Sequence, residues 1–255
     1  MYANTHPNSI FKPLICLVIL VFLGCEGTVS EQVKLHSSLK RHHVLIQEGN
    51  SGSARVRLIQ FMELNGETSH PLFLMGLSYH SEKKYAKAAE WFTKSTVAFE
   101  DPFPLAWHYL GWSQLYLGAI EGSQISFEHY LRTNPDEPDS LFALGLLAME
   151  SGDLKKAEAI FNTVVRLAVT NNAIRAKALA RWADTLTECN DWEASLPKYK
   201  EAIEINPDLY EAWFRYAKVL QRLGRAEEAD KALVEFEHAR KRVRPDLYLQ
   251  TRFPE

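Results

Sequence analysis

A short pattern of apolar and small residues recurs along most of the chain. From Leu72 onward, an apolar residue is followed three positions later by another and then directly by a small residue. The five small residues are Gly76, Gly111, Gly145, Ala183 and Ala217, which gives successive spacings of 35, 34, 38 and 34 residues by their positions. Apolar residues three to four apart lie on one face of a helix, so each copy predicts an amphipathic helix.

A second pattern follows each copy at a constant distance. A small residue precedes a large one by four positions in the pairs Ala88 and Phe92, Ser123 and Phe127, Ala157 and Phe161, Ser195 and Tyr199, and Ala229 and Leu233. Such pairs allow two helices to approach closely while the large side chain fills the space beside them. Between the two patterns lie Gly118, Gly152, Asn190 and Gly224, which tolerate the left-handed backbone that ends a helix. The first unit has Lys83 at this place and is less ideal.

Prolines and one irregular spacing mark the borders between units. Pro135 and Pro207 each stand between Asn and Asp, where a helix should stop or start. The four-residue excess between the third and fourth units is expected at Asn171 to Arg175, as a small insertion in an inter-repeat loop. The chain is therefore predicted to be all-α, with about five helix-turn-helix units over residues 69–243.

With this period, the chain resembles the tetratricopeptide repeat family. The resemblance implies a right-handed superhelical solenoid in which the first helix of each unit lines the concave surface. By the groove positions of that family, the first three units would contribute a largely apolar and aromatic wall, made of Phe73, Leu74, Leu77, His108, Tyr109, Trp112, Phe142 and Leu146. The alternative is that these aromatic residues are buried against the N-terminal hairpin.

The same mapping selects a mostly basic set in units four and five. Its members are Lys177, Arg181, Asp184, Arg215 and Lys218. This surface would suit a peptide with hydrophobic anchors and an acidic end. Arg181 and Arg215 are expected to converge on one ligand carboxylate, and reversing their charge should weaken partner binding while stability hardly changes. The alternative is that these cations only solvate the surface.

A carboxylate-clamp repeat domain is matched in one respect only. Lys177 and Arg181 lie one helical turn apart, as two of that domain's clamp residues do, but His108, Trp112 and Ala143 stand where it has Lys or Asn. Recognition of a chaperone tail is therefore disfavoured.

The N-terminus reads as a secretory signal. Lys12 precedes an apolar run from Pro13 to Leu23, which is too short to span a bilayer and is followed by Gly24 and Cys25. The end of this run resembles the lipobox of bacterial lipoproteins, which implies lipidation of Cys25. The alternative is ordinary cleavage nearby, for example after Ser30. Residues 1–25 are therefore predicted to be the signal peptide, and both alternatives place the chain in the cell envelope, as a periplasmic or outer-membrane lipoprotein in the first case.

The flanks of the array are harder to interpret. Residues 26–68 are predicted to form a linker and an atypical capping hairpin, with a flexible break at residues 50–53 and a short helix or strand from Val56 to Leu64. Residues 244–255 form a C-terminal tail, preceded by cations that suit a helix C-terminus.

Composition and motifs argue against catalysis, cofactors and nucleic acid. The formal net charge is only -3, and the chain has no Gly-rich phosphate loop, His-Glu-x-x-His helix or Cys-x-x-Cys pair. His70, His80 and His108 lack carboxylate or Cys companions at ligand spacing, so no metal site is expected. Cys189 lacks a Cys/His pairing signature and is expected to be an inert thiol.

These observations predict a non-enzymatic adaptor. It would be held at a membrane by lipid at Cys25 and would bind a partner protein or peptide in its groove. Two alternatives stay open at this point: a structural subunit of a stable envelope oligomer, and an accessory repeat region of an envelope enzyme.

Overall fold

The computed structural model describes residues 37–98 and 103–246, and every regular element in these ranges is helical. A 3₁₀ turn at Ser37–Leu39 precedes the helices. The twelve α-helices are α1 (Lys40–Gln47), α2 (Ser51–Asn65), α3 (Ser69–Ser81), α4 (Tyr85–Val97), α5 (Leu105–Tyr116), α6 (Ile120–Leu131), α7 (Pro138–Glu150), α8 (Leu154–Leu167), α9 (Asn172–Glu188), α10 (Trp192–Ile205), α11 (Tyr210–Arg222) and α12 (Ala226–Val243). The five predicted units are the pairs from α3 with α4 to α11 with α12.

The glycines of the repeated pattern fix how the two helices of a unit pack. A Cβ added at Gly145 would lie 2.5 Å from a ring carbon of Phe161, so the ring occupies the space that a side chain would need. Gly76 and Phe92 stand in the same relation, as do Gly111 and Phe127. All three rings have no exposed surface, and neither do Ala88, Ser123 and Ala157, the small residues predicted to pair with them.

The turn between the two helices of each unit uses one left-handed residue. Gly118, Gly152 and Gly224 have φ between 74° and 78°, and Asn190 has φ 62°. Lys83 adopts the same conformation, with φ 58°, although a lysine has no special tolerance for it. The turn geometry of the repeat therefore overrides the local preference of this residue.

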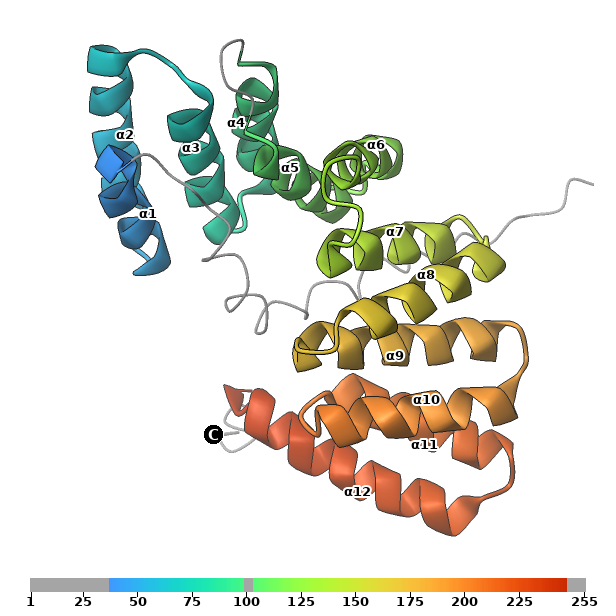
Figure 1. Cartoon of the computed structure of the whole chain (residues 1–255). Helices are drawn as coiled ribbons and strands as arrows, with labels where there is room; N and C mark the ends of the chain where they lie inside the picture. The colour runs from blue at the N-terminus through green and yellow to red at the C-terminus, as the bar shows by residue number, and fades with distance from the viewer. Residues whose placement is uncertain (1–36, 99–102, 247–255) are drawn as a thin grey trace, which may run out of the picture.

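The helix pairs follow one another along a curved path from α1 to α12 (Figure 1). First helices of neighbouring units contact each other, most closely α3 with α5 and α7 with α9, whereas second helices of neighbouring units make no comparable contact in the described ranges. The row whose members are closest together lies on the inside of a curve. The concave side is therefore formed by α3, α5, α7, α9 and α11.

The four-residue excess is not in a loop, contrary to the sequence-based expectation. Helix α9 has 17 residues, whereas α3, α5, α7 and α11 have 12 or 13. The additional residues form an extra first turn, capped by the Asn171 side chain, which accepts a hydrogen bond from the backbone N–H of Ile174 (3.3 Å). An Asn at this place starts a helix instead of prolonging the loop.

The N-terminal hairpin is more regular than expected. Helix α2 begins at Ser51, so the predicted flexible break at residues 50–53 belongs mostly to the helix, and no strand forms at Val56 to Leu64. Ser51 is buried, and its hydroxyl lies 2.8 Å from that of Ser81 on α3. This tertiary contact outweighs the weak helix propensity of the Ser and Gly residues.

The predicted signal peptide and Cys25 lie outside the described residues. Among the helices that are described, none is long and apolar enough to cross a membrane.

Candidate functional site

The extra turn of α9 forms one wall of a pocket of about 430 Å³ at the inner edge of the array. The pocket is also lined by the first turn of α5, the end of α6, the α6–α7 loop, the start of α7 and the segment from the end of α8 to Asn171. Ala173 and Ile174 belong to the added turn, and Lys177 follows it on the same helix. The pocket thus exists where the array departs from its regular period.

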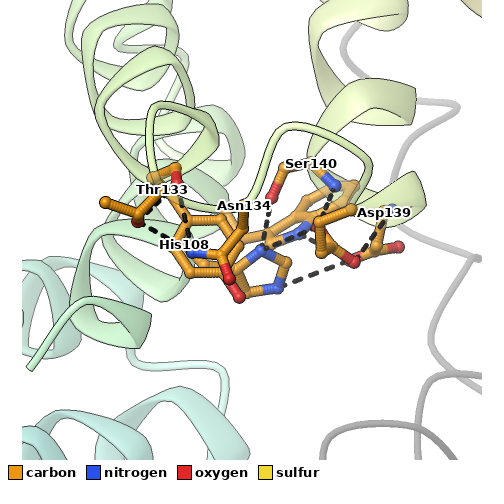
Figure 2. Close-up of polar contacts among 8 residues, drawn as sticks. His108, Thr133, Asn134, Asp139 and Ser140 are labelled. Atoms are coloured by element: carbon orange, nitrogen blue, oxygen red, sulfur yellow. Dashed lines mark hydrogen bonds and ion pairs between the residues drawn. The ribbon is translucent and has the colours of Figure 1, made fainter. Parts of the chain in front are cut away.

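A buried histidine organises the pocket's base. His108 on α5 is 5% exposed, and its Nδ1 lies 2.7 Å from the hydroxyl oxygen of Ser140. Its Nε2 lies 3.5 Å from Oδ2 of Asp139, which also accepts a hydrogen bond from the indole N–H of Trp112 (2.9 Å). Figure 2 shows the His108 ring between Asp139 and Ser140. These contacts join α5 to α7 and fix the Asp139 carboxylate.

The loop before α7 is held by side chains at both ends. Asn134 donates its amide N–H to the Thr133 hydroxyl (2.9 Å) and to the backbone carbonyl of Tyr130 (3.3 Å), next to His108 in Figure 2. Glu137 caps α7, and its two oxygens accept the backbone N–H groups of Asp139 (3.1 Å) and Ser140 (2.7 Å). A carboxylate at a helix N-terminus is favoured by the helix dipole.

Burial affects two titratable groups at the pocket's base. Burial raises the pKa of the Asp139 carboxyl, and the nearby Glu137 charge raises it further, whereas the His108 and Lys177 charges and the Trp112 hydrogen bond lower it. Burial also raises the pKa of Tyr130 to about 12, with added contributions from the charges of Glu137 and Asp139. In both groups burial is the largest cause, because a charged form is poorly solvated at the pocket's base.

The aromatic residues predicted to line the groove belong mostly to the core. Trp112 and Phe142 are 8% and 2% exposed, because each ring packs on the phenylalanine of its own unit, Phe127 and Phe161 respectively. Phe73 and Leu74 have no exposed surface. Leu77, Tyr109 and Leu146 are partly exposed on the inner helices, so contact with a partner stays a prediction for these three.

In the predicted basic half of the groove, the two arginines are neutralised by a carboxylate of the protein itself. Arg181 and Arg215 do converge on one carboxylate, but it is that of Asp184: Arg181 donates to Oδ2 at 2.9 Å, and Arg215 donates to the same oxygen. The Tyr199 hydroxyl donates to Oδ1 at 2.5 Å. Asp184 is 8% exposed. The sequence-based expectation was that reversing the charge of both arginines hardly changes stability. The structure instead predicts a loss of stability, because the Asp184 carboxylate would lose its compensating charges.

The remaining two predicted cations have different surroundings. Lys177 lines the pocket. Lys218 is exposed on α11, with its ammonium 4.6 Å from the centre of the Phe214 ring. The sequence pattern did not identify the loop residues Asn134 to Glu137, because the family mapping follows only the first helices.

Within the described ranges, no group of three or more His, Cys, Asp and Glu side chains is placed to hold a metal ion. His80 and His108 are both buried, and His80 packs against Tyr85, Phe92 and Tyr109. Cys189 is an exposed free thiol.

Comparison with known proteins agrees with this architecture. Residues 110–171 and 183–224 match family models described as the tetratricopeptide repeat and the TPR repeat. These two stretches therefore have the sequence features of tetratricopeptide repeats. A curated relative, the Protein CTR9 homolog of Arabidopsis thaliana, is 35% identical over 92 residues, which are 35% of this chain and 8% of the relative. The chain thus spans less than a tenth of that protein's length.

Solved tetratricopeptide structures share the fold at low sequence identity. The crystal structure of the APC/C hetero-tetramer Cut9-Hcn1 matches with a TM-score of 0.61 and 15% identity, over 84% of this chain and 42% of that chain. YrrB, described as a TPR protein with an unusual peptide-binding site, matches with a TM-score of 0.55 and 17% identity, over 76% of this chain and 97% of its own. These likenesses concern the fold of the repeats.

Proposed function

We propose that this repeat protein is an adaptor at the cell envelope that binds a partner polypeptide along the concave surface. The observation that carries the proposal is the row of inner helices, on which Tyr109 and Leu146 are partly exposed and Lys218 is exposed. Stacked helix pairs provide a long surface of this kind. The peptide-binding site of YrrB, which shares the fold, supports the same use of the array.

Capture of a partner from membrane extracts tests the binding surface. The inner-surface variant combines Tyr109→Ala, Leu146→Ala and Lys218→Glu. Its matched control carries Ile125→Ala and Lys200→Glu on the second helices α6 and α10, where both residues are exposed. The partner should be retained by the control and lost by the inner-surface variant, with both proteins equally helical by circular dichroism. Equal capture by the two variants contradicts the proposal.

Attachment to the membrane is a separate part of the proposal. The signal-like N-terminus supports lipidation at Cys25. Cys25→Ser should abolish labelling with a radioactive fatty acid and move the protein to the soluble fraction of the envelope. Unchanged membrane attachment in that variant contradicts the lipid anchor and leaves the binding surface unaffected.

A further inference from the structure

The last unit of the array leaves two repeat positions uncovered. On the first helices, the residue three places before the recurring small residue is at most 6% exposed in units one to four, but its counterpart Phe214 in unit five is 38% exposed. On the second helices, the residue seven places after the small member of the small–large pair is buried in units one to four, whereas Phe236 is only partly buried. The buried counterparts are Phe73, His108, Phe142 and Ala180 on the first helices, and Ser95, Tyr130, Val164 and Ala202 on the second.

The second unit shows what covers these positions inside the array. Its two residues are His108 and Tyr130, with ring centres 5.3 Å apart. The next first helix, α7, lies on them, and its Ser140 hydroxyl oxygen is 2.7 Å from Nδ1 of His108. Phe214 and Phe236 form the same pair, also with ring centres 5.3 Å apart. Within the described residues no unit follows α12 (Figure 1), so this pair lies where the first helix of a sixth unit would pack.

The junction between units four and five shows how charge is used at such a contact. Asp184 stands directly after the small residue of unit four, and its carboxylate accepts a hydrogen bond from Arg215 on the next first helix. Lys218 has the same repeat position in unit five and is exposed, with its ammonium 4.6 Å from the centre of the Phe214 ring. A helix that packs on the last unit in the register of α11 would therefore bring its residue at the place of Arg215 to a cation. An Asp or Glu at that place would form the same charge pair with the signs exchanged.

A second cation beside the aromatic pair is already engaged. Arg240 lies 5.0 Å from the centre of the Phe236 ring and forms an ion pair with Glu237 on the same helix, at 2.9 Å. Lys218 is therefore the cation of this face that can distinguish the charge of a partner.

We propose that the face formed by Phe214, Phe236 and Lys218 binds an amphipathic helix of a partner protein that carries a carboxylate. The helix would take the place of the first helix of a sixth unit. Ser140, which covers the equivalent pair, stands five residues before the small residue of its unit, and Arg215 stands two before its own. The apolar contact and the carboxylate should therefore be three positions apart, on one side of the partner helix.

The sequence of the chain favours a different polypeptide as the occupant. The residues at the place of Arg215 in the other first helices are Leu74, Tyr109, Ala143 and Arg181, and none of them is acidic. Residues 247–255 contain one acidic residue, Glu255, and the residue three positions before it is Arg252 instead of an apolar one. A second copy of the chain thus has no first helix that matches Lys218 in this register. The surface is additional to the inner surface of the proposed function.

Fluorescence anisotropy with the full-length protein tests the charge and the register. The probe is a labelled and stapled helical peptide that copies α7, Pro138–Glu150, because α7 covers the equivalent pair; it carries Ser140→Leu and Ala143→Glu. A matched peptide carries Ala143→Lys instead. The glutamate peptide should bind with a dissociation constant in the micromolar range, and the lysine peptide about tenfold more weakly. Added salt should reduce the difference.

Three variants of the protein check the assignment to this face. Lys218→Glu should reverse the preference, so that the lysine peptide binds about tenfold more tightly than the glutamate peptide. Phe214→Ser should weaken both peptides about tenfold. Lys200→Glu, an equal charge change at an exposed site on α10, should leave both affinities unchanged. Circular dichroism checks that the variants are equally helical.

Several outcomes overturn the inference. They are equal binding of the two peptides, an unchanged preference in Lys218→Glu, and no binding up to about 1 mM protein. Binding that requires removal of residues 247–255 would make those residues the occupant, and a dimer by light scattering that is lost in Phe214→Ser would make it a second copy. Partner capture that depends on Tyr109 and Leu146, which belong to other units, would in each case leave the proposed function standing.

Discussion

Asp184 determines what the neighbouring arginines bind. Two arginines from adjacent inner helices and the Tyr199 hydroxyl contact its carboxylate. Its charge raises the pKa of Tyr199, whose burial has the larger effect in the same direction. Arg181 and Arg215 were expected to bind a ligand carboxylate. Through Asp184 they instead connect α9, α10 and α11.

Removing one of these cations should cost stability. Arg215→Ala leaves the buried Asp184 carboxylate with one fewer compensating charge, so the free energy of unfolding should fall by about 3 kcal/mol. Arg242→Ala is the matched control, because its pair with Asp208 is more than half exposed on both sides and should be worth less than about 1 kcal/mol. Urea unfolding measures both values. A similar small loss for the two variants would show that Asp184 is well solvated.

His80 gives the array a pH-dependent stability. Burial, and to a lesser extent the His108 charge, lower the pKa of His80 to about 4, from 6.5 in an unfolded chain. The unfolded chain binds the proton first as the pH falls, so stability present above pH 6.5 should be lost between pH 6.5 and pH 4, by about 3 kcal/mol in all.

The variant His80→Gln isolates this contribution. It should be less stable at pH 7 because the histidine's packing on Tyr85, Phe92 and Tyr109 is lost. Its stability should also depend less on pH than that of the parent protein, as measured by thermal unfolding from pH 7 to pH 4. Parallel pH profiles for the two proteins would assign the acid sensitivity to other groups.

At the scale of the helix, close packing within a unit decides which glycines are irreplaceable. Gly145→Ala would place a Cβ 2.5 Å from the Phe161 ring and should destabilise the protein by about 2 kcal/mol. Gly52→Ala places its Cβ no closer than 3.9 Å to the Arg55 guanidinium and should stabilise α2 by up to about 1 kcal/mol. Thermal unfolding should therefore shift in opposite directions, and a loss in both variants would contradict the packing argument.

The elements were predictable from the sequence wherever the packing pattern repeats. The recurring small residues and the small–large pairs predicted the two helices of each unit, because close helix contact requires small side chains beside large ones. The structure alone shows that Gly76, Gly111 and Gly145 each face the phenylalanine of their own unit. The extra turn of α9 was not predictable from spacing alone, since four added residues are consistent with either a loop or one helical turn. The hydrogen bond that the Asn171 side chain accepts from the backbone N–H of Ile174 decides between them, and it depends on local geometry.

The candidate site was predictable only in part, for a related reason. Family positions selected His108 and Lys177, which do meet in the pocket, and Arg181 and Arg215, which do converge. They gave no information on Asn134 to Glu137, whose contribution depends on how the loop is held. The sequence pattern also did not predict that Arg181 and Arg215 are neutralised, because this depends on which carboxylate each cation contacts in the folded array.

Across the whole molecule, stability should be distributed along the array. The buried residues fall into three consecutive clusters, from Leu39 to Tyr130, from Trp112 to Ala178 and from Leu179 to Ala232. Val165 and Trp182 pack against both of the last two clusters. Each helix pair thus depends mainly on its neighbours, and the terminal pairs have a neighbour on one side only.

A core truncation at one end should therefore act locally. Leu220 on α11 has no exposed surface, and Leu220→Ala should cost about 3 kcal/mol in that unit. Hydrogen exchange followed by mass spectrometry should show faster exchange in α11 and α12, a smaller effect in α10, and no change from α3 to α6. The mirror variant, Leu72→Ala on α3, should give the reverse distribution because it truncates the core at the other end. Uniform acceleration along the chain in either variant would mean that the array unfolds as one cooperative unit, in which case a ligand bound at α11 and α12 would stabilise all the repeats equally.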